Sequence, residues 1–331
     1  MGGMEQRRLG WTGKDVSVIG LGTWQLGADW GNVEEADARS VLEASVAAGV
    51  TFFDTADVYG DGRSEQIIGR FLAETGAPVT VATKMGRRVE QKPENYTLAN
   101  FRAWTERSRV NLQTDTLDLV QLHCPPTEVI ESPRTYEDLE TLRSEGAIAA
   151  HGVSVETCDQ ALVAIERGVA TLQIIVNAFR LKPFDEVLPA AAEKGVGVIV
   201  RLPLASGLLS GRYTKDTTFA PDDHRRFNRH GEAFDRGETF SGVDFETGVV
   251  AAQEFADLAR QAAPQATTAQ VALAWLAQHP QITTVIPGAR NVVQARANAA
   301  AGTLPPLDAT FDAAVRRLYD ERFRAAIHGR W

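Results

Sequence analysis

Cysteine is scarce in this chain: Cys124 and Cys158 are the two cysteines among 331 residues. Two thiols cannot build a disulfide framework, so a reducing cytoplasm is the expected compartment. No apolar run approaches the roughly 20 residues that cross a bilayer. The start, MGGMEQRRLG, lacks the apolar core of a secretory signal, and Gln6 breaks the myristoylation pattern. We therefore expect a cytoplasmic protein with no membrane partner.

Positive charge is also in short supply. The formal net charge is −9, and lysine is rare beside arginine. Nucleic-acid binding proteins normally carry a basic surface, so nucleic acid is excluded as the expected partner. Internal repeats, low-complexity tracts and Pro/Gly-rich linkers are absent as well. The simplest organisation is one domain spanning residues 1–331, whose oligomeric state the sequence leaves open.

What the chain does contain is an alternation of short β-rich runs with longer amphipathic stretches. Eight strand–helix pairs predict a (β/α)8 TIM barrel. An open doubly wound sheet is the alternative, but Gly20-Leu21-Gly22 lacks the third glycine of the dinucleotide fingerprint, since position 25 is Gln. The predicted strands are near 17–22, 51–54, 79–83, 117–122, 148–153, 171–176, 196–201 and 282–286. The predicted helices are near 34–48, 64–74, 97–112, 135–145, 158–167, 185–194, 247–262 and 290–300.

Three segments stand outside this alternation. Residues 6–16 are predicted to form a hairpin that plugs the floor of the barrel. Residues 206–246 are a long polar, Gly-rich loop after the seventh strand; loops of this length are usually functional or disordered, so we interpret this one as a lid, with a passive surface loop as the alternative. Residues 267–279 and 308–328 are predicted as extra helices near the C-terminus.

Four polar groups lie at or just beyond the ends of successive predicted strands. Asp54 ends the first of them, Tyr59 follows in a glycine-rich turn, and Lys84 and His123 end the next two. Neighbouring parallel strands are about 5 Å apart, so these side chains can converge on one spot. An acid, a phenol, an amine and an imidazole in one place indicate a proton-transfer site.

The chemistry of that set follows from the pKa of tyrosine, which is about 10 in a free side chain. A neighbouring ammonium favours the phenolate, so Lys84 is expected to lower the pKa of Tyr59, while Asp54 keeps Lys84 protonated. Tyr59 would then act as a general acid toward a carbonyl oxygen that His123 helps to orient. A carbonyl being protonated accepts hydride, which proteins take from a nicotinamide cofactor. The site requires no metal ion.

Each residue also has a plain structural interpretation. Asp54 and Lys84 could be a structural ion pair, Tyr59 a packing residue, and His123 a core histidine. Asp57 competes with Asp54 for the role of partner to Lys84. A lyase or isomerase that uses Lys84 as a Schiff-base nucleophile is a further alternative, although pairing with Asp54 would keep that amine charged.

These motifs resemble the aldo-keto reductase superfamily. The stretch Asp54-Thr55-Ala56-Asp57-Val58-Tyr59-Gly60, followed by Gly62-Arg63-Ser64-Glu65 and Gly69, is similar to its first signature. Lys84 and His123 stand where the family's catalytic lysine and histidine would fall. The resemblance implies NADPH-dependent reduction of small-molecule aldehydes or ketones, with NADPH (NADP+) expected rather than NADH. Channel-associated relatives make a cofactor-binding sensor or partner-binding protein with little turnover the alternative.

The resemblance also implies where the cofactor would lie. Its nicotinamide would be bordered by Thr23 and Trp24, near Asp54, with Ser154 and Gln173 bonding the carboxamide. The residues after the seventh strand would follow the pyrophosphate, and those of the last strand–helix turn would meet the adenosine end. The first set is Arg201, Pro203, Leu204, Ser206, Gly207, Leu209, Gly211 and Arg212; the second is Gly288, Arg290, Gln294 and Asn298.

The chain departs from the family pattern at three positions: Val155 follows Ser154 where the family often has Asn, so that one carboxamide contact is expected to be absent, and the other two, Arg201 and Gly288, change the charge of the site. Arg201 stands where many members place an aromatic ring, and its guanidinium is expected to repel the cationic oxidised nicotinamide and so favour the reduced cofactor. Gly288 stands where some members carry a phosphate-binding lysine, so Arg290 is the residue expected to bind the 2′-phosphate. The substrate pocket is expected to be lined by Trp24, Trp30, Tyr59 and His123, with Phe234 and Phe240 from the insertion.

Overall fold

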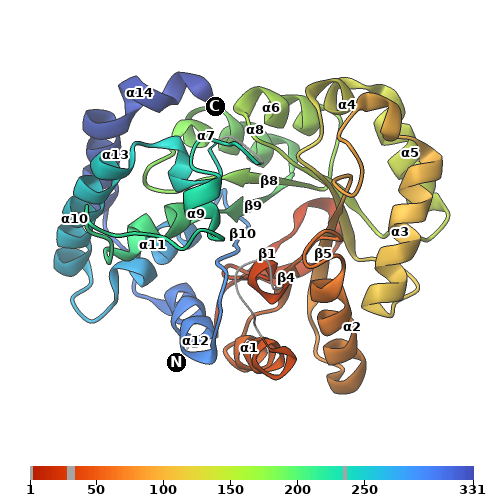
Figure 1. Cartoon of the computed structure of the whole chain (residues 1–331), viewed down its shortest axis with the longest axis horizontal. Helices are drawn as coiled ribbons and strands as arrows, with labels where there is room; N and C mark the ends of the chain where they lie inside the picture. Colours follow the sequence, from red (N-terminus) through yellow and green to blue (C-terminus); the bar gives the residue numbers. More distant parts are fainter. Residues whose placement is uncertain (1–2, 28–33, 234–236) are drawn as a thin grey trace.

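The computed structural model describes residues 3–27, 34–233 and 237–331. Its centre is a parallel sheet in which the strand order follows the chain (Figure 1). Parallel bridges from Ile19 to Val285 and from Gly22 to Gly288 join the first strand to the last. The sheet therefore closes as the predicted (β/α)8 barrel. Its strands are β3 Leu21–Gly22, β4 Phe52–Asp54, β5 Thr80–Met85, β6 Leu119–His123, β7 His151–Ser154, β8 Thr171–Ile175, β9 Gly197–Arg201 and β10 Thr284–Val285.

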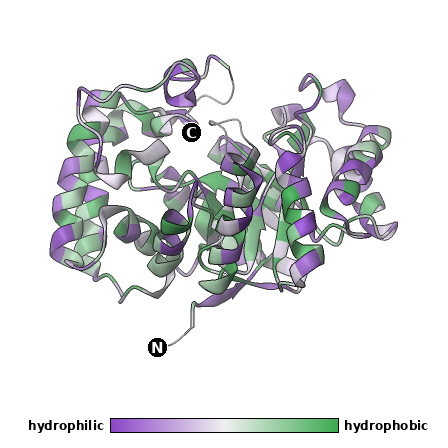
Figure 2. Ribbon diagram, turned by 60° about the horizontal axis from the view of Figure 1, so that its bottom comes forward, coloured by the Kyte–Doolittle hydropathy of each residue, from purple (hydrophilic) through white to green (hydrophobic). Residues whose placement is uncertain are grey.

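The helices surround the strands, and the residues facing the barrel are mainly hydrophobic (Figure 2). Helix α2 shows the pattern clearly, because Ile67, Ile68 and Phe71 are buried at helical spacing. Two of the helices, α6 and α11, begin with a Thr/Gln capping box. The helices that cover the barrel are α1 Glu35–Ala47, α2 Arg63–Thr75, α3 Leu98–Leu112, α4 Thr127–Glu131, α5 Pro133–Ser144, α6 Cys158–Glu166, α7 Lys182–Asp185, α8 Val187–Lys194, α11 Thr268–Ala277 and α12 Val292–Ala300.

The predicted N-terminal hairpin closes one end of the barrel. Strands β1 (Gln6–Arg8) and β2 (Asp15–Ser17) pair antiparallel. Leu9 and Val16 from this hairpin are fully buried in a compact apolar cluster with barrel residues. Those partners lie in the barrel strands or one residue beyond their ends: Phe52, Ala82, Leu119, Ala150, Ala170, Ile199 and Ile286. The hairpin thus fills the barrel floor and leaves the carboxyl ends of the strands at the opposite end.

The insertion after β9 is more structured than a simple loop. It contains a 3-10 helix at Ala205–Ser210, the short helix α9 at His224–Phe227 and another 3-10 turn at Phe240–Gly242. Aromatic rings pack it together: the Tyr213 and Phe219 centroids are 5.4 Å apart, and those of Phe240 and Phe245 are 5.0 Å apart. The polar composition predicted a loop because these widely spaced aromatics give no periodic signal.

The C-terminal region adds α10 (Phe245–Ala262), α13 (Ala309–Tyr319) and α14 (Ala325–Ile327). A π-helical turn at Asp320–Arg324 interrupts the single helix expected over 308–328. In the described parts of the chain, no helix combines the length and the apolar character needed to span a membrane.

Candidate active site

The four predicted groups meet at the carboxyl end of the barrel. Lys84 Nζ lies 2.5 Å from Asp54 Oδ2 and donates to Tyr59 Oη at 3.4 Å. It also donates to the carbonyl of Thr55 at 2.9 Å. The rings of Tyr59 and His123 lie edge to face, with centroids 6.0 Å apart. Lys84 pairs with Asp54 and not with Asp57, which answers the question the sequence left open.

Local structure explains this convergence. Asp54 pairs in register with Gly22 and Ala82, and Lys84 pairs with Gln121, so the strand ends lie at one edge. Tyr59 reaches the same place because the turn after β4 passes close to the segment before α1. A Cβ on Gly60, where φ is +60°, would lie 2.0 Å from the carbonyl oxygen of Gly27. Glycine is required there both by backbone conformation and by space.

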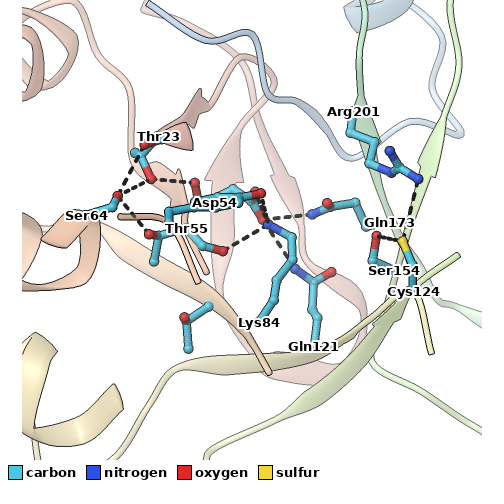
Figure 3. A network of polar contacts seen from close by, with 12 residues as sticks. Thr23, Asp54, Thr55, Ser64, Lys84, Gln121, Cys124, Ser154, Gln173 and Arg201 are labelled. Carbon is cyan, nitrogen blue, oxygen red and sulfur yellow. Dashed lines mark hydrogen bonds and ion pairs between the residues drawn. The ribbon is translucent and has the colours of Figure 1, made fainter. Parts of the chain in front are cut away.

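Two buried amides hold the carboxylate of Asp54 from the other side. Gln173 Nε2 donates to Asp54 Oδ1 at 2.7 Å, and Gln121 Nε2 donates to the same oxygen at 3.3 Å (Figure 3). Both side chains are buried. Gln173 was expected as a nicotinamide contact, whereas Gln121 was missed. The signal for Gln121 was available, since an amide inside the apolar run of β6 needs a buried partner.

A hydroxyl network supports the backbone at Asp54. Thr23 Oγ1 donates to the Asp54 carbonyl at 2.9 Å, and Ser64 Oγ lies 2.9 Å from the hydroxyls of both Thr23 and Thr55 (Figure 3). All of these residues are buried. The Thr23 hydroxyl, an expected cofactor neighbour, therefore fixes β3 against β4.

The pKa values of Lys84 and Tyr59 differ from the expectation in one respect. Burial is the largest influence on the pKa of Lys84 and lowers it, yet Asp54 and then Tyr59 together more than compensate, so the pKa of Lys84 is raised. Burial also raises the pKa of Tyr59, and the nearby Lys84 offsets this only in part. The predicted net lowering of the tyrosine pKa was wrong, because desolvation outweighs the ammonium. Tyr59 is thus protonated at neutral pH.

His123 is held neutral. Burial, followed by the charges of Arg87, Lys84 and Arg201, lowers its pKa well below the usual value. Its Nδ1 is buried and forms no hydrogen bond with any residue in the described ranges. A buried, unpaired ring nitrogen beside Tyr59 is an unused polar group at the heart of the site.

The aromatic residues expected to line the substrate pocket differ in where the structure places them. Trp24 stacks on Tyr59, with centroids 6.2 Å apart, and meets the ring of His224 from the insertion. Phe240 is 1% exposed and packs in the aromatic cluster of the insertion, so its expected place in the pocket was wrong. Trp30 and Phe234 lie outside the described residues.

Arg201 ends β9 and is buried against the insertion. Its guanidinium forms an ion pair with the carboxylate of Glu238 and donates to the Val155 carbonyl at 3.2 Å. Arg201 Nη2 also lies 3.6 Å from Cys124 Sγ, which in turn contacts Ser154 Oγ at 3.4 Å (Figure 3). Glu238 could not be predicted as the partner of Arg201, because no local pattern links positions 37 residues apart.

The expected pyrophosphate residues after β9 lie along one turn. Gly207 has a φ of +95°, and a Cβ there would lie 2.4 Å from the Tyr213 hydroxyl. The Ser206 hydroxyl donates a hydrogen bond to the Glu238 carbonyl within the insertion. The side chain of Arg212 is exposed. Leu209 is fully buried, so only its backbone could meet a ligand. The remaining members of the set are Pro203, which is buried, Leu204, which is half-buried, and Gly211, which has φ +69° and ends the 3-10 helix.

The expected adenosine end is a turn held by two amides. Gln294 Oε1 accepts from the Arg290 amide at 2.8 Å, and Asn298 Nδ2 donates to the Gly288 carbonyl at 3.1 Å. Arg290 is exposed at the N-terminus of α12. The side-chain amide of Gln25 occupies the space that a Cβ on Gly288 would need. Gln25 Oε1 is buried and has no hydrogen-bond partner among the residues described.

Asp57 is a second buried carboxylate behind the catalytic turn. Its side chain is fully buried, and within the described ranges neither carboxylate oxygen has a hydrogen bond of good geometry, although the Val58 amide is close enough to lower its pKa slightly. Burial, and then the nearby Glu65, raise the pKa of Asp57 to about 7. Arg88 and Arg107 oppose this rise. Asp57 therefore titrates in the neutral range, which the sequence did not indicate.

Comparison with known proteins identifies the family. Residues 18–320 match the model of the aldo/keto reductase family. The chain is 36% identical over 231 residues to the aldo-keto reductase YhdN of Bacillus subtilis, covering 67% of this chain and 69% of that protein. It is also 32% identical to an uncharacterized oxidoreductase of Mycobacterium bovis, covering 87% and 85% of the two chains. The chain belongs to the aldo/keto reductase family of oxidoreductases, as its motifs suggested.

Solved structures agree with this placement. The chain resembles a glycerol dehydrogenase from Gluconobacter oxydans with a TM-score of 0.79 and 28% identity, covering 96% and 95% of the two chains. It also resembles an aldo-keto reductase from Klebsiella pneumoniae in complex with NADPH, with a TM-score of 0.69 and 26% identity over 96% and 95%. Both comparisons support the (β/α)8 fold over almost the whole chain.

Proposed function

We propose that this protein reduces aldehydes or ketones to alcohols with NADPH, using Tyr59 as the general acid. The observation that carries the proposal is the contact of Lys84 Nζ with both Asp54 and Tyr59 at the open end of the barrel. A phenol, an ammonium and a neutral imidazole around one point are suited to protonating a carbonyl oxygen. The similarity to a Klebsiella pneumoniae structure in complex with NADPH supports the choice of cofactor.

Residues of the chain fit a nicotinamide dinucleotide in several places. The buried atom Gln25 Oε1 lies against Gly288 and offers a polar partner at the adenosine end of the expected path. Arg212 and Arg290 are exposed cations, and Arg290 stands at the N-terminus of α12, a favourable place for a phosphate. Ser154 and Gln173 would face the nicotinamide. When bound, the cofactor supplies the hydride.

The role of each catalytic residue follows from its state. Tyr59 holds its proton at neutral pH and donates it from Oη to the carbonyl oxygen. Lys84 then stabilises the phenolate that this donation leaves, because the ammonium is 3.4 Å away. Asp54 keeps Lys84 charged, while Gln121 and Gln173 keep Asp54 aimed at it. Neutral His123 orients the carbonyl through its ring nitrogen, and Trp24 shields the Tyr59 ring from water.

The test is NADPH oxidation with a panel of small aldehydes and ketones, with the alcohol quantified. We expect one alcohol for each NADPH consumed, and a faster rate than with NADH at equal concentration. A Lys84→Arg variant serves as a charge-matched control, because it keeps the cation but changes its geometry. Tight NADPH binding with no turnover of any carbonyl in the panel would contradict the proposal.

A cofactor-binding sensor or partner-binding protein is the second candidate. One observation favours it: the chain is 29% identical to a probable voltage-gated potassium channel subunit beta from Arabidopsis thaliana, covering 92% of this chain. The same turnover assay separates the two candidates. A bound cofactor that exchanges slowly and is consumed less than once per hour with every carbonyl would favour the sensor.

A further inference from the structure

The insertion after β9 places a carboxylate inside the catalytic end of the barrel. Glu238 is 8% exposed and forms an ion pair with the equally buried Arg201. Their side chains are 11% and 10% exposed. An ion pair at this depth is only weakly screened by solvent, so the charges of both partners act strongly on their surroundings.

The segment that carries Glu238, residues 238–241, is anchored on both sides. The Ser206 hydroxyl donates to the Glu238 carbonyl at 3.1 Å and accepts from the Phe240 amide at 3.0 Å. Asn177 Nδ2 donates to Ser241 Oγ at 2.7 Å. Phe240 and Ser241 both have positive φ, at +54° and +59°, which is unfavourable for side-chain-bearing residues. These bonds hold the strained segment, so Glu238 is positioned and not merely adjacent.

The ion pair faces the reaction centre. Arg201 lies against Cys124, the residue after His123, and its charge contributes to the lowered pKa of His123. The charge of Glu238 in turn contributes to the raised pKa of Tyr59. A second buried guanidinium, Arg180, also lies within reach of both charges. Glu238 therefore places a negative charge beside two buried guanidinium groups, those of Arg201 and Arg180.

We propose that Glu238 is a positioning residue whose ion pair with Arg201 sets the preference between oxidised and reduced cofactor. This inference rests on the proposed function and on the expectation from the sequence that Arg201 lies beside the nicotinamide. The oxidised ring carries a positive charge and the reduced ring does not. Arg201 alone would repel the oxidised form. The carboxylate of Glu238 offsets part of that repulsion, so the pair determines how strongly the reduced cofactor is preferred.

The experiment is a fluorescence titration of the whole protein with NADPH and with NADP+. The variants are Glu238→Gln, Arg201→Gln and the double variant. Glu254→Gln serves as a control, because it removes one carboxylate from an ion pair with Arg322 on the outside of the molecule. The quantity compared is the Kd for NADP+ divided by the Kd for NADPH.

The two single variants have opposite expected effects. Glu238→Gln removes a negative charge beside Arg201 and should raise the ratio about tenfold, whereas Arg201→Gln removes a positive charge and should lower it about tenfold. The double variant and Glu254→Gln should stay within threefold of wild type. If the ion pair were purely structural, its loss would weaken the binding of both cofactor forms equally and leave the ratio of the two Kd values unchanged.

Each outcome is decisive, and either folded single variant is sufficient. A ratio unchanged within twofold in Glu238→Gln, or in Arg201→Gln if the former does not fold, overturns the inference. If the wild-type protein binds and uses NADPH but its variants show an unchanged ratio of the two Kd values, the inference about Glu238 fails and the proposed function is unaffected. A wild-type protein that binds neither form of the cofactor removes the proposed function and the inference together.

Discussion

Replacing Asp57 with asparagine should stabilise the protein, and more so at high pH. The native carboxyl has its pKa raised to about 7, whereas an unfolded aspartate has about 3.9. The folded state therefore binds more protons than the unfolded state between these values. Stability is fully present below about pH 4 and is lost as the pH rises through 7. Asp57→Asn removes that loss, because an amide has the shape of the acid but does not ionise.

The magnitude follows from the two pKa values. Ionising Asp57 costs about 1.5 kcal/mol of folding free energy at pH 5 and about 4 kcal/mol at pH 8. The stability difference between variant and wild type should thus widen by about 2.5 kcal/mol over this range. For a chain of 331 residues, this corresponds to a relative shift in Tm of about 4 °C.

The assay is urea and thermal unfolding, followed by tryptophan fluorescence at pH 5, 6, 7 and 8. Asp216→Asn is the matched control, because it removes the same charge from an exposed position in the insertion. Wild type and control should lose stability together as the pH rises, while Asp57→Asn should change less. Parallel curves for Asp57→Asn and wild type would show that Asp57 is ionised with an ordinary pKa, and would refute the reasoning.

Three further predictions concern the site and the barrel floor. Lys84→Met should keep NADPH affinity within about threefold but lower kcat by about 10² or more, because the phenolate of Tyr59 loses its cation; unchanged kcat in stopped-flow assays would exclude Lys84 from catalysis. Arg290→Ala should reduce the affinity for NADPH much more than that for NADH, by titration, and a fully kept preference would remove Arg290 from that role. Leu9→Ala should lower unfolding free energy by about 2–5 kcal/mol in urea, because Leu9 is fully buried in the floor cluster; a loss under about 1 kcal/mol would show that the hairpin is dispensable.

The sequence was sufficient for the barrel and for the meeting of the four groups. Strand-end positions are local information, and parallel strands carry them to one edge, so Asp54, Lys84 and His123 could be placed from their spacing. Their resemblance to a family signature made Tyr59 recognisable as well. The π-helical turn at Asp320–Arg324 could not be anticipated, because one extra residue within a helix leaves the hydrophobic pattern nearly unchanged.

The charge balance of the site could not be read from the sequence. Lys84 was expected to lower the pKa of Tyr59, but burial has the larger effect, and burial depends on the complete fold. The contact of Glu238 with Arg201 and the burial of Asp57 are likewise tertiary features. Periodicity reports which face of an element is buried, and it says nothing about which charges share one buried volume.

The most direct test of the account is a single-turnover comparison of wild type and Tyr59→Phe. Each protein is premixed with NADPH and then with an aldehyde that wild type reduces, and NADPH fluorescence is followed in a stopped-flow instrument. We predict unchanged NADPH affinity and a hydride-transfer rate lower by about 10²–10⁴ in Tyr59→Phe, because the proton donor is gone. A rate within threefold of wild type would contradict the assignment of Tyr59 as the acid.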